Sequence, residues 1–183
     1  LHVTDWIPGR KQWPTAKLNT PEFNQQLPLA EVTIAEMLAP KGYRSASVGK
    51  WHLGGAGYLP EQQGFSLNVS GDHRGGVRKF FGPLEAGNLT LAEGESLTDR
   101  LTSEGEKFIE ANKDTPFFLY LAHYTPHLPL DAKPEVVDKY KRKGGTPDKN
   151  NPTYAAMIES VDDCVRRIRA KLAETGMADR TVV

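Results

Sequence analysis

Two short segments of the sequence carry lysine and histidine side chains that could handle an anionic substrate. Residues 49–54 read GKWHLG and follow directly on an apolar strand pattern. A lysine can bind a substrate oxyanion, and a histidine can take up or hand on a proton. Lys50 and His52 are therefore candidate catalytic residues. The alternative is a surface lysine and a core-edge histidine beside a buried Trp51.

The second segment, residues 123–129, reads HYTPHLP and also follows an apolar run. Its two histidines stand four residues apart, a spacing that suits a shared metal ion on a helix, but Pro126 and Pro129 argue against a helix. A zinc site is therefore disfavoured, and no metal ligand is assigned in this chain. We expect His127 to be held by its flanking prolines and to face the same cleft as Lys50 and His52. A solvent-facing loop histidine is the alternative.

A third segment, residues 70–76, reads SGDHRGG, and its glycines would let charged groups approach an anionic ligand closely. Asp72 and Arg74 are interpreted as solvated charges. Further along, Cys164 lies beside an apolar helical stripe and is interpreted as a small core residue rather than a nucleophile. The acidic residues Glu159, Asp162 and Asp163 are expected to form the solvated face of the last helix or a helix-to-loop salt bridge.

The elements that must position these residues alternate between helix and strand. Residues 33–36 (TIAE) fit a capping box, so a helix is predicted from there to about residue 41, ended by Gly42. A short strand follows over 43–48. Residues 49–96 form a long glycine-rich stretch, which is usual for functional loops. Residues 1–30 are expected to be an irregular arm.

The second half of the chain continues this alternation. A helix is predicted over 98–112, and the apolar run 117–122 is typical of a central strand buried on both faces. A short helix over 134–141 and a long one from Tyr154 to about Gly176 follow, and 181–183 is expected to begin another strand. This order predicts an α/β layered fold.

Composition excludes several classes of protein. The 183 residues contain 23 Lys plus Arg and 23 Asp plus Glu, so the net charge is zero. Such a balance does not suit a nucleic-acid-binding protein. No apolar run approaches the roughly 20 residues that span a bilayer. The single cysteine excludes an internal disulfide framework.

Taken together, the GKWHLG segment, the TPH-x-P-type loop about 70 residues later and the helix with Tyr154 resemble the sulfatase family of the alkaline phosphatase superfamily, in particular arylsulfatase A-like enzymes. The resemblance runs along essentially the whole chain, 1–183. It implies a three-layer α/β/α sandwich with a mixed sheet, of which this chain supplies two or three strands. It also implies a sulfuric ester hydrolase that acts on sulfated sugars or aryl sulfates.

The resemblance implies a role for each matched residue. Lys50 would contact the sulfate and the formylglycine nucleophile, and His52 would hydrogen-bond the formylglycine hydroxyl. His127 would contact the sulfate ester near its leaving oxygen. His73 is a weaker candidate for substrate binding, because a glycine-rich loop reaches the substrate in similar enzymes.

Other parts of the family's machinery are expected outside these residues. The formylglycine motif, Cys/Ser-x-Pro/Ala-x-Arg, should precede Leu1, together with the paired aspartates that bind calcium. An Asp-Asn pair is expected after Val183. The chain is therefore interpreted as a partial catalytic domain that alone neither hydrolyses sulfate esters nor holds calcium tightly. The family resemblance also implies a periplasmic or secreted protein.

Two alternatives remain open. The chain could belong to a phosphoesterase or phosphonate hydrolase of the same superfamily, which uses an unmodified Thr or Ser. It could instead belong to a non-catalytic protein that binds sulfated glycans and keeps Lys50, His52 and His127 as an anion pocket.

Overall fold

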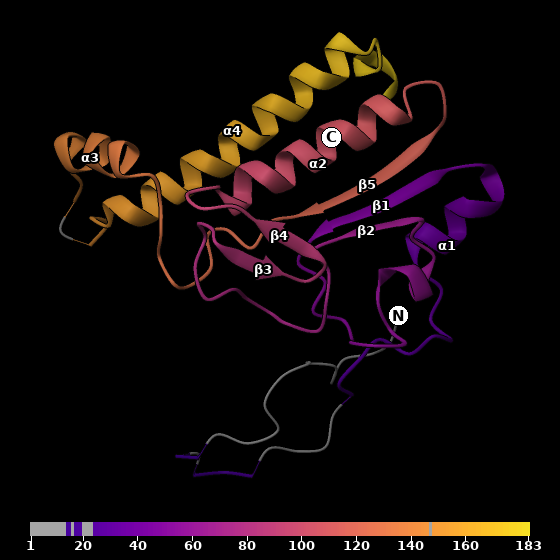
Figure 1. The fold of residues 1–183 in the computed structure, drawn as a ribbon, viewed down its shortest axis with the longest axis horizontal. Helices are drawn as coiled ribbons and strands as arrows, with labels where there is room; N and C mark the ends of the chain where they lie inside the picture. The colour runs from indigo at the N-terminus through magenta and orange to yellow at the C-terminus, as the bar shows by residue number, and fades with distance from the viewer. Residues whose placement is uncertain (1–13, 16, 20–23, 147) are drawn as a thin grey trace.

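Three short strands pair into one parallel sheet, and they define the centre of the molecule (Figure 1). The computed structural model describes residues 14–15, 17–19, 24–146 and 148–183. The order in the sheet is β2 (Leu67–Val69), β1 (Arg44–Gly49) and β5 (Phe117–Ala122). β1 pairs along its full length with β5, from Arg44 opposite Phe117 to Gly49 opposite Ala122. The carboxyl ends of β1 and β5 therefore lie side by side, where ligands gather in α/β proteins.

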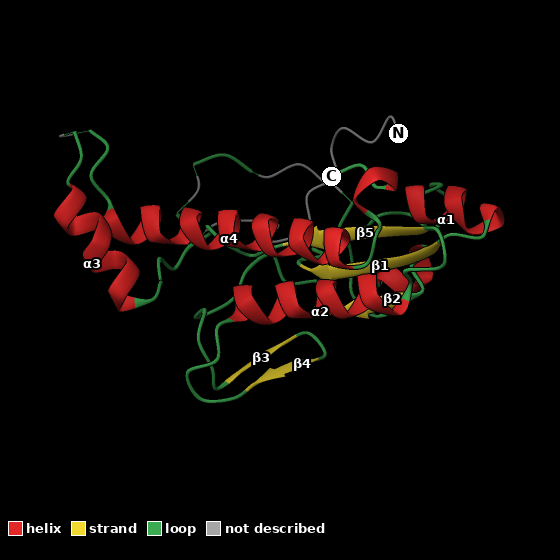
Figure 2. Cartoon of the chain, turned by 90° about the horizontal axis from the view of Figure 1, so that it is seen from above, coloured by secondary structure: helices red, strands yellow, loops and turns green. Residues whose placement is uncertain are grey.

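Helices cover the two faces of this sheet (Figure 2). α2 (Leu97–Ala111) and α4 (Pro152–Glu174) pack against the face that carries Phe117, Leu119 and Leu121. Gly105 of α2 brings that helix close, since a Cβ there would lie 3.3 Å from Ile168 and 3.5 Å from Leu119. The short α1 (Ile34–Leu38) packs on the other face with Trp51, Phe65 and Phe118. The α/β fold with helix, sheet and helix layers is thus confirmed for this part of the protein.

Local signals in the sequence predict most helix ends correctly. Thr33 accepts from the Glu36 amide and Glu36 accepts from the Thr33 amide, which is the expected capping box of α1. A 3-10 turn (Ala39–Lys41) extends this helix, and Gly42 ends it at a φ of +81°. α3 (Pro134–Lys143) begins at a proline, and Gly176 follows α4. A last 3-10 turn spans Ala178–Arg180.

The stretch 49–96 contains more regular structure than the sequence predicts. Besides β2 it holds a 3-10 turn (Pro60–Gln63) and a hairpin of β3 (Leu84–Ala86) and β4 (Leu89–Leu91). Each strand has only three residues, too few to show an alternating pattern. The hairpin is fixed by Asn88, which accepts from the Ser70 amide at 2.7 Å and donates to the Asn68 carbonyl at 2.9 Å. It packs beneath α2 (Figure 2).

Two predicted strands differ from the structure. The run 117–122 is not a central strand buried on both faces, because β5 pairs only with β1 among the described residues and Tyr120 is 43% exposed. β1 is the central strand instead. Residues 181–183 form no strand here, and Val182 is fully exposed. The three strands of the sheet are all parallel, so the mixed sheet stays a prediction.

The long helix α4 buries only part of its apolar stripe. Met157, Ile168 and Leu172 are buried, whereas Tyr154 and Val165 are about half exposed. No helix in the described part of the chain is both long enough and apolar enough to cross a bilayer. The predicted arm 1–30 lies largely outside the described residues, and so does the resemblance over 1–13.

Candidate active site

Lys50 and His52 follow β1 at the carboxyl edge of the sheet. Gly49 ends the strand at a φ of +109°, and a Cβ there would collide with the Ala122 carbonyl, so only glycine lets β1 and β5 approach so closely. The Lys50 amide then donates to the Ala122 carbonyl at 2.7 Å. The strand conformation does not persist beyond this point, because His52 has a φ of +59°. Lys50 and His52 therefore do not continue β1 as alternating side chains of one extended strand.

The imidazole of His52 packs against the glycine-rich loop 71–76. The His52 amide donates to the Asp72 carbonyl at 2.9 Å. Its ring lies so close to Gly75 that a Cβ at that residue would collide with it. The neighbouring Gly76 faces His127, since a Cβ there would lie 3.7 Å from His127 Nδ1. His52 and His127 thus lie against two adjacent glycines of the same short loop.

His127 lies in the turn after β5 and is exposed. Its amide donates to the Tyr124 carbonyl at 3.0 Å, and its Nδ1 lies 2.9 Å from the Leu128 carbonyl oxygen. A carbonyl can only accept, so this contact places the proton on Nδ1 and leaves Nε2 for another partner. The His127 ring is therefore oriented with one nitrogen available at the protein surface.

The loop 71–76 is anchored by polar contacts at its base. The buried Tyr124 hydroxyl donates to the Ser70 carbonyl at 3.0 Å, and burial raises the pKa of this phenol. Asn68 accepts from the Gly71 amide and donates to the Gly71 carbonyl, both at 3.0 Å. These contacts fix the loop where His52 and His127 meet it. The sequence analysis does not single out Tyr124. Its position as an aromatic residue between a strand and a proline-rich turn is the pattern that could have indicated such an anchoring role.

His73 lies on the outside of the same loop, next to the residues that follow β1. A Cβ at Gly55 would lie 3.5 Å from the Cβ of His73, and the His73 side chain is exposed. The structure therefore places His73 beside the 49–54 segment.

Asp72 and Arg74 form an ion pair rather than two separately solvated charges. Arg74 Nε donates to Asp72 Oδ2 at 2.6 Å, and the Arg74 amide donates to Asp72 Oδ1 at 2.7 Å. The hydrogen bond to Asp72 raises the pKa of Arg74 above its ordinary value. Because Asp72 also accepts from His52 through its backbone, this pair stiffens the loop beside the histidines.

Trp51 anchors the GKWHLG segment in the core. Its indole Nε1 donates to the Tyr58 carbonyl at 2.9 Å, and its ring meets Phe65 edge-on with centroids 5.8 Å apart. Lys50 and His52, on either side of this buried side chain, are half-buried. Lys50 Nζ has no ion-pair or hydrogen-bond partner among the described residues, which leaves its charge available for an anion.

The site is rich in cationic and imidazole groups and poor in carboxylates. Across the described ranges, no three His, Cys, Asp or Glu side chains converge as a metal site would require. Calcium prefers six to eight oxygen ligands, and the residues around Lys50, His52 and His127 do not supply them. These residues fit an oxyanion instead, because a lysine and imidazoles donate to anionic oxygens.

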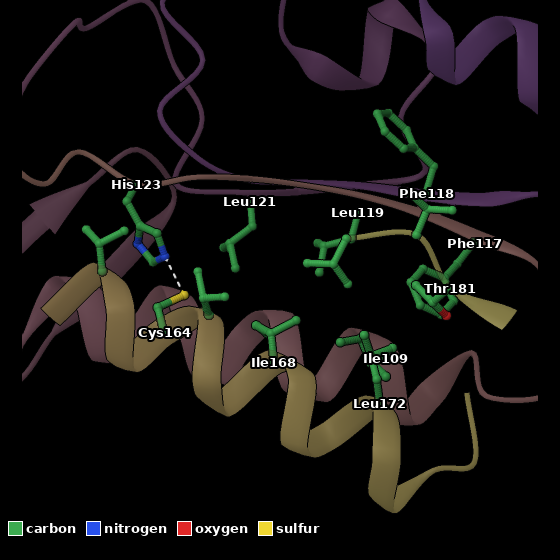
Figure 3. Close-up of a pocket in the computed structure, with 14 residues that line it drawn as sticks. Ile109, Phe117, Phe118, Leu119, Leu121, His123, Cys164, Ile168, Leu172 and Thr181 are labelled. Atoms are coloured by element: carbon green, nitrogen blue, oxygen red, sulfur yellow. Dashed lines mark hydrogen bonds between the residues drawn. The ribbon is translucent and has the colours of Figure 1, made fainter. Parts of the chain in front are cut away.

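A separate cavity of about 420 Å³ lies between β5 and α4 and includes none of these residues (Figure 3). Its lining is largely apolar, with one polar pair in which His123 Nε2 lies 2.8 Å from Cys164 Sγ. Burial lowers the pKa of His123 to about 4. Cys164 is buried with Ile168 and Leu172, so its interpretation as a core residue is confirmed. Its contact with His123, 41 residues away, was not foreseen.

On the outer face of α4, the acidic residues make salt bridges. Glu159 pairs with Lys139 of α3 at 2.6 Å, and Asp163 pairs with Arg166 at 3.1 Å. Asp162 and Asp163 are exposed, as a solvated face requires, whereas both of these ion pairs join helical residues and neither is the expected helix-to-loop salt bridge.

A lysine and two histidines thus follow adjacent strands of an α/β sheet, an arrangement typical of α/β proteins that bind anionic substrates. Comparison with known proteins is more specific. The sequence model of the Sulfatase family matches residues 11–183. The chain therefore belongs to the sulfatase family.

Curated relatives agree with this assignment. The chain is 29% identical over 184 residues to the uncharacterised sulfatase YdeN of Escherichia coli, a match that covers 86% of this chain and 32% of that protein. It is 29% identical over 180 residues to an arylsulfatase of Hemicentrotus pulcherrimus, with 86% and 31% covered. It is 27% identical over 193 residues to human arylsulfatase A, with 89% and 36% covered. The chain thus spans about a third of the length of these relatives.

Solved structures share the fold. The crystal structure of Ps i-CgsB in complex with k-i-k-neocarrahexaose superposes with a TM-score of 0.71 at 25% identity, and the match covers 96% of this chain and 41% of that one. The putative sulfatase yidJ of Bacteroides fragilis gives a TM-score of 0.66 at 20% identity, with 85% and 43% covered. These matches confirm the alkaline phosphatase-like architecture expected from the sequence.

Proposed function

We propose that this chain is the middle part of a sulfatase catalytic domain and that the whole protein hydrolyses sulfate esters. The observation that carries the proposal is that Lys50 and His52 directly follow β1 while His52 and His127 both lie against one short loop, in a chain of the sulfatase family. A sulfate ester carries a delocalised negative charge that needs cationic donors, and its leaving oxygen needs a proton. Both needs are met by residue types at this edge of the sheet.

Lys50 is proposed to bind the sulfate group. Its backbone is fixed by the hydrogen bond to Ala122, while its ammonium group is not engaged by any described side chain. A charge held at the rim of a partly buried site stabilises the developing negative charge in the transition state. Replacement of Lys50 by a neutral residue is therefore expected to affect kcat more than folding.

His127 is proposed to act at the leaving oxygen. The Leu128 carbonyl holds Nδ1, so Nε2 is the nitrogen that can hand a proton to the departing ester oxygen, which then leaves as the alcohol, when the ring is protonated. His52, fixed against Gly75, is proposed to hydrogen-bond the hydroxyl of the nucleophile. His73 is proposed to contact the substrate from the outer side of the loop.

The cofactors proposed for the whole protein are calcium and a formylglycine nucleophile, both expected outside residues 1–183. The described residues contain no cluster of three metal-ligating side chains. When bound, calcium would supply a positive charge against the sulfate. The roles proposed for Lys50, His52 and His127 are argued from the positions of these residues and not from a bound calcium ion.

A sulfated saccharide is the proposed substrate class, with aryl sulfates as simpler substrates. A relative of known structure, 25% identical to this chain, was crystallised with k-i-k-neocarrahexaose, a saccharide. We also propose that the whole protein is periplasmic or secreted, as the family resemblance implies.

The test uses the full-length protein with 4-methylumbelliferyl sulfate, the corresponding phosphate ester and sulfated oligosaccharides. We expect hydrolysis of sulfate esters, and we expect Lys50→Ala and His127→Ala each to lower kcat by about 10² to 10⁴. The exposed Lys113→Ala, at the end of α2, is the control. Faster hydrolysis of the phosphate ester would favour the phosphoesterase, and binding of oligosaccharide without turnover would favour the glycan-binding protein.

A further inference from the structure

The loop that meets His52 and His127 also lines a cavity of about 310 Å³. Arg74 and Gly76 come from this loop and Arg78 follows it, whereas Glu85 comes from β3 and Tyr124 from the segment after β5. Gly76 is the residue that faces His127, so the cavity adjoins the proposed sulfate site. None of the roles proposed above uses it.

Two arginines supply this cavity with hydrogen-bond donors that suit an anionic ligand. Arg74 is held in place by Asp72, yet its side chain is 48% exposed and keeps donors for a further partner. Arg78 is exposed and forms no ion pair or hydrogen bond with any described side chain. Asp72 already pairs with Arg74 and the lining also carries the carboxylate of Glu85, so Arg78 is the lining arginine that is left without an ion pair to a described side chain.

Arginine is the side chain best suited to bind a planar or tetrahedral anion through two parallel hydrogen bonds. The loop is fixed at its base by Tyr124 and Asn68, so its arginines are presented by an ordered backbone. Gly76 lines the cavity and also faces His127, so a ligand in the cavity would lie near the proposed sulfate site. A sugar whose sulfate occupies the site near His127 would therefore extend a neighbouring group toward Arg74 and Arg78.

We propose that this cavity, which we call the arginine pocket, binds a second anionic group of the substrate. That group is a sulfate or carboxylate on the sugar next to the one that carries the cleaved sulfate ester. The proposal rests on the proposed sulfatase function and adds to it a preference for saccharides with at least two charges. It makes Arg78 a specificity-determining residue.

The test compares two probes on the full-length protein: a disaccharide with one sulfate on each sugar, and its monosulfated counterpart. The measured quantity is the ratio of their kcat/KM values. We expect Arg78→Gln to lower this ratio about tenfold, because the second sulfate loses its main partner. Glu85→Gln should raise the ratio, because it removes a repulsive charge beside the same sulfate. Arg142→Gln, an exposed arginine at the end of α3, is the matched control.

Calorimetric binding of the disulfated probe gives a second readout that does not require turnover. Suppose that Arg78→Gln changes neither the kcat/KM ratio nor the affinity for the disulfated probe, while the protein still hydrolyses sulfate esters. The proposal that the arginine pocket binds a second anionic group is then overturned, and the proposed function stands. If the wild type hydrolyses no sulfate ester, the proposed function fails. In that case a tenfold loss of affinity in Arg78→Gln would still support an anion pocket, and an unchanged affinity would overturn it too.

Discussion

Single residues decide how closely the segments of this site approach one another. Gly49 lets β1 and β5 come together, and Gly75 admits the imidazole of His52 where a larger residue would collide. Gly76 is less crowded, with the His127 ring 3.7 Å from the position a Cβ would take. The two neighbouring glycines therefore differ in how much a methyl group would disturb the site.

Gly75→Ala is expected to displace the ring of His52 without unfolding the protein, because a side chain can yield where a backbone cannot. A shift of about 1 Å in a catalytic group costs about 10²-fold in rate, so kcat of the full-length enzyme should fall by about that factor. Gly76→Ala should cause a much smaller loss. Steady-state kinetics and the melting temperature of both variants check this, and equal losses in the two would contradict the role given to Gly75.

His123 couples stability to pH. Burial lowers its pKa from 6.5 to about 4, so the unfolded chain takes up a proton more readily than the folded protein. The charged Asp99 opposes this shift only in part. The contribution of the neutral, buried His123 to the free energy of unfolding is therefore fully present above pH 6.5. It is lost as the pH falls from 6.5 through about 4.

The expected loss from this residue between pH 7 and pH 4.5 is about 2 to 3 kcal/mol. Urea unfolding at the two pH values measures it, with His123→Gln as the variant that cannot titrate. The variant should lose less stability on acidification than the wild type. A wild type and variant with the same pH dependence would show that another group is responsible.

At the scale of elements, α2 and α4 are joined by more than apolar packing. Arg167 of α4 donates through Nε and Nη2 to the two carboxylate oxygens of Glu106 on α2, and the Nε contact is 3.0 Å. Nη2 also donates to Ser103 Oγ at 2.8 Å. Both charged side chains are about three-quarters buried. These contacts set the register of the helix pair that covers the sheet.

Arg167→Lys is expected to lower the free energy of unfolding by about 1 to 2 kcal/mol, because an ammonium group cannot make both bonds of the fork. Its neighbour Arg166 pairs with Asp163 in an exposed i,i+3 contact, so Arg166→Lys should change stability by less than about 0.5 kcal/mol. Chemical denaturation of the two variants compares them directly. A larger cost at Arg166 than at Arg167 would refute the assignment.

At the scale of the molecule, this part of the fold leaves apolar surface that other elements could cover. Among the described residues, β5 has a partner strand on one side only. The cavity beside α4 is lined in part by Val165 and Val182, whose side chains are exposed. The chain covers about a third of its relatives' length. A catalytic centre assembled from several segments is consistent with both facts.

The isolated 183-residue chain is expected to show no sulfate ester hydrolysis and no tight calcium binding, in contrast to the full-length protein. The described residues hold no cluster of metal ligands, and the nucleophile is expected elsewhere. Turnover of 4-methylumbelliferyl sulfate and calcium titration of the isolated chain check this. Measurable turnover by the chain alone would refute it. Sequencing the flanking coding region would reveal whether a Cys/Ser-x-Pro/Ala-x-Arg motif precedes Leu1.

The sequence by itself determined the features that depend on neighbouring residues. The capping box of Thr33 and Glu36, the stop at Gly42, the long helix α4 and the GKWHLG and TPH segments are all local patterns, and they suffice for the fold class and the family. Local patterns succeed here because caps, turns and helical periodicity involve residues within a few positions of each other.

Only the tertiary structure decided which distant residues meet. Several contacts join residues that are 21 to 51 positions apart in the sequence. They are the contacts of His52 with Gly75 and of His127 with Gly76, the pairing of the three-residue β2 with β1, and the hydrogen bond between His123 and Cys164. The same packing made β1 rather than β5 the central strand. Such contacts depend on how whole elements pack, and a packed arrangement leaves no period or spacing in the sequence from which it could be predicted.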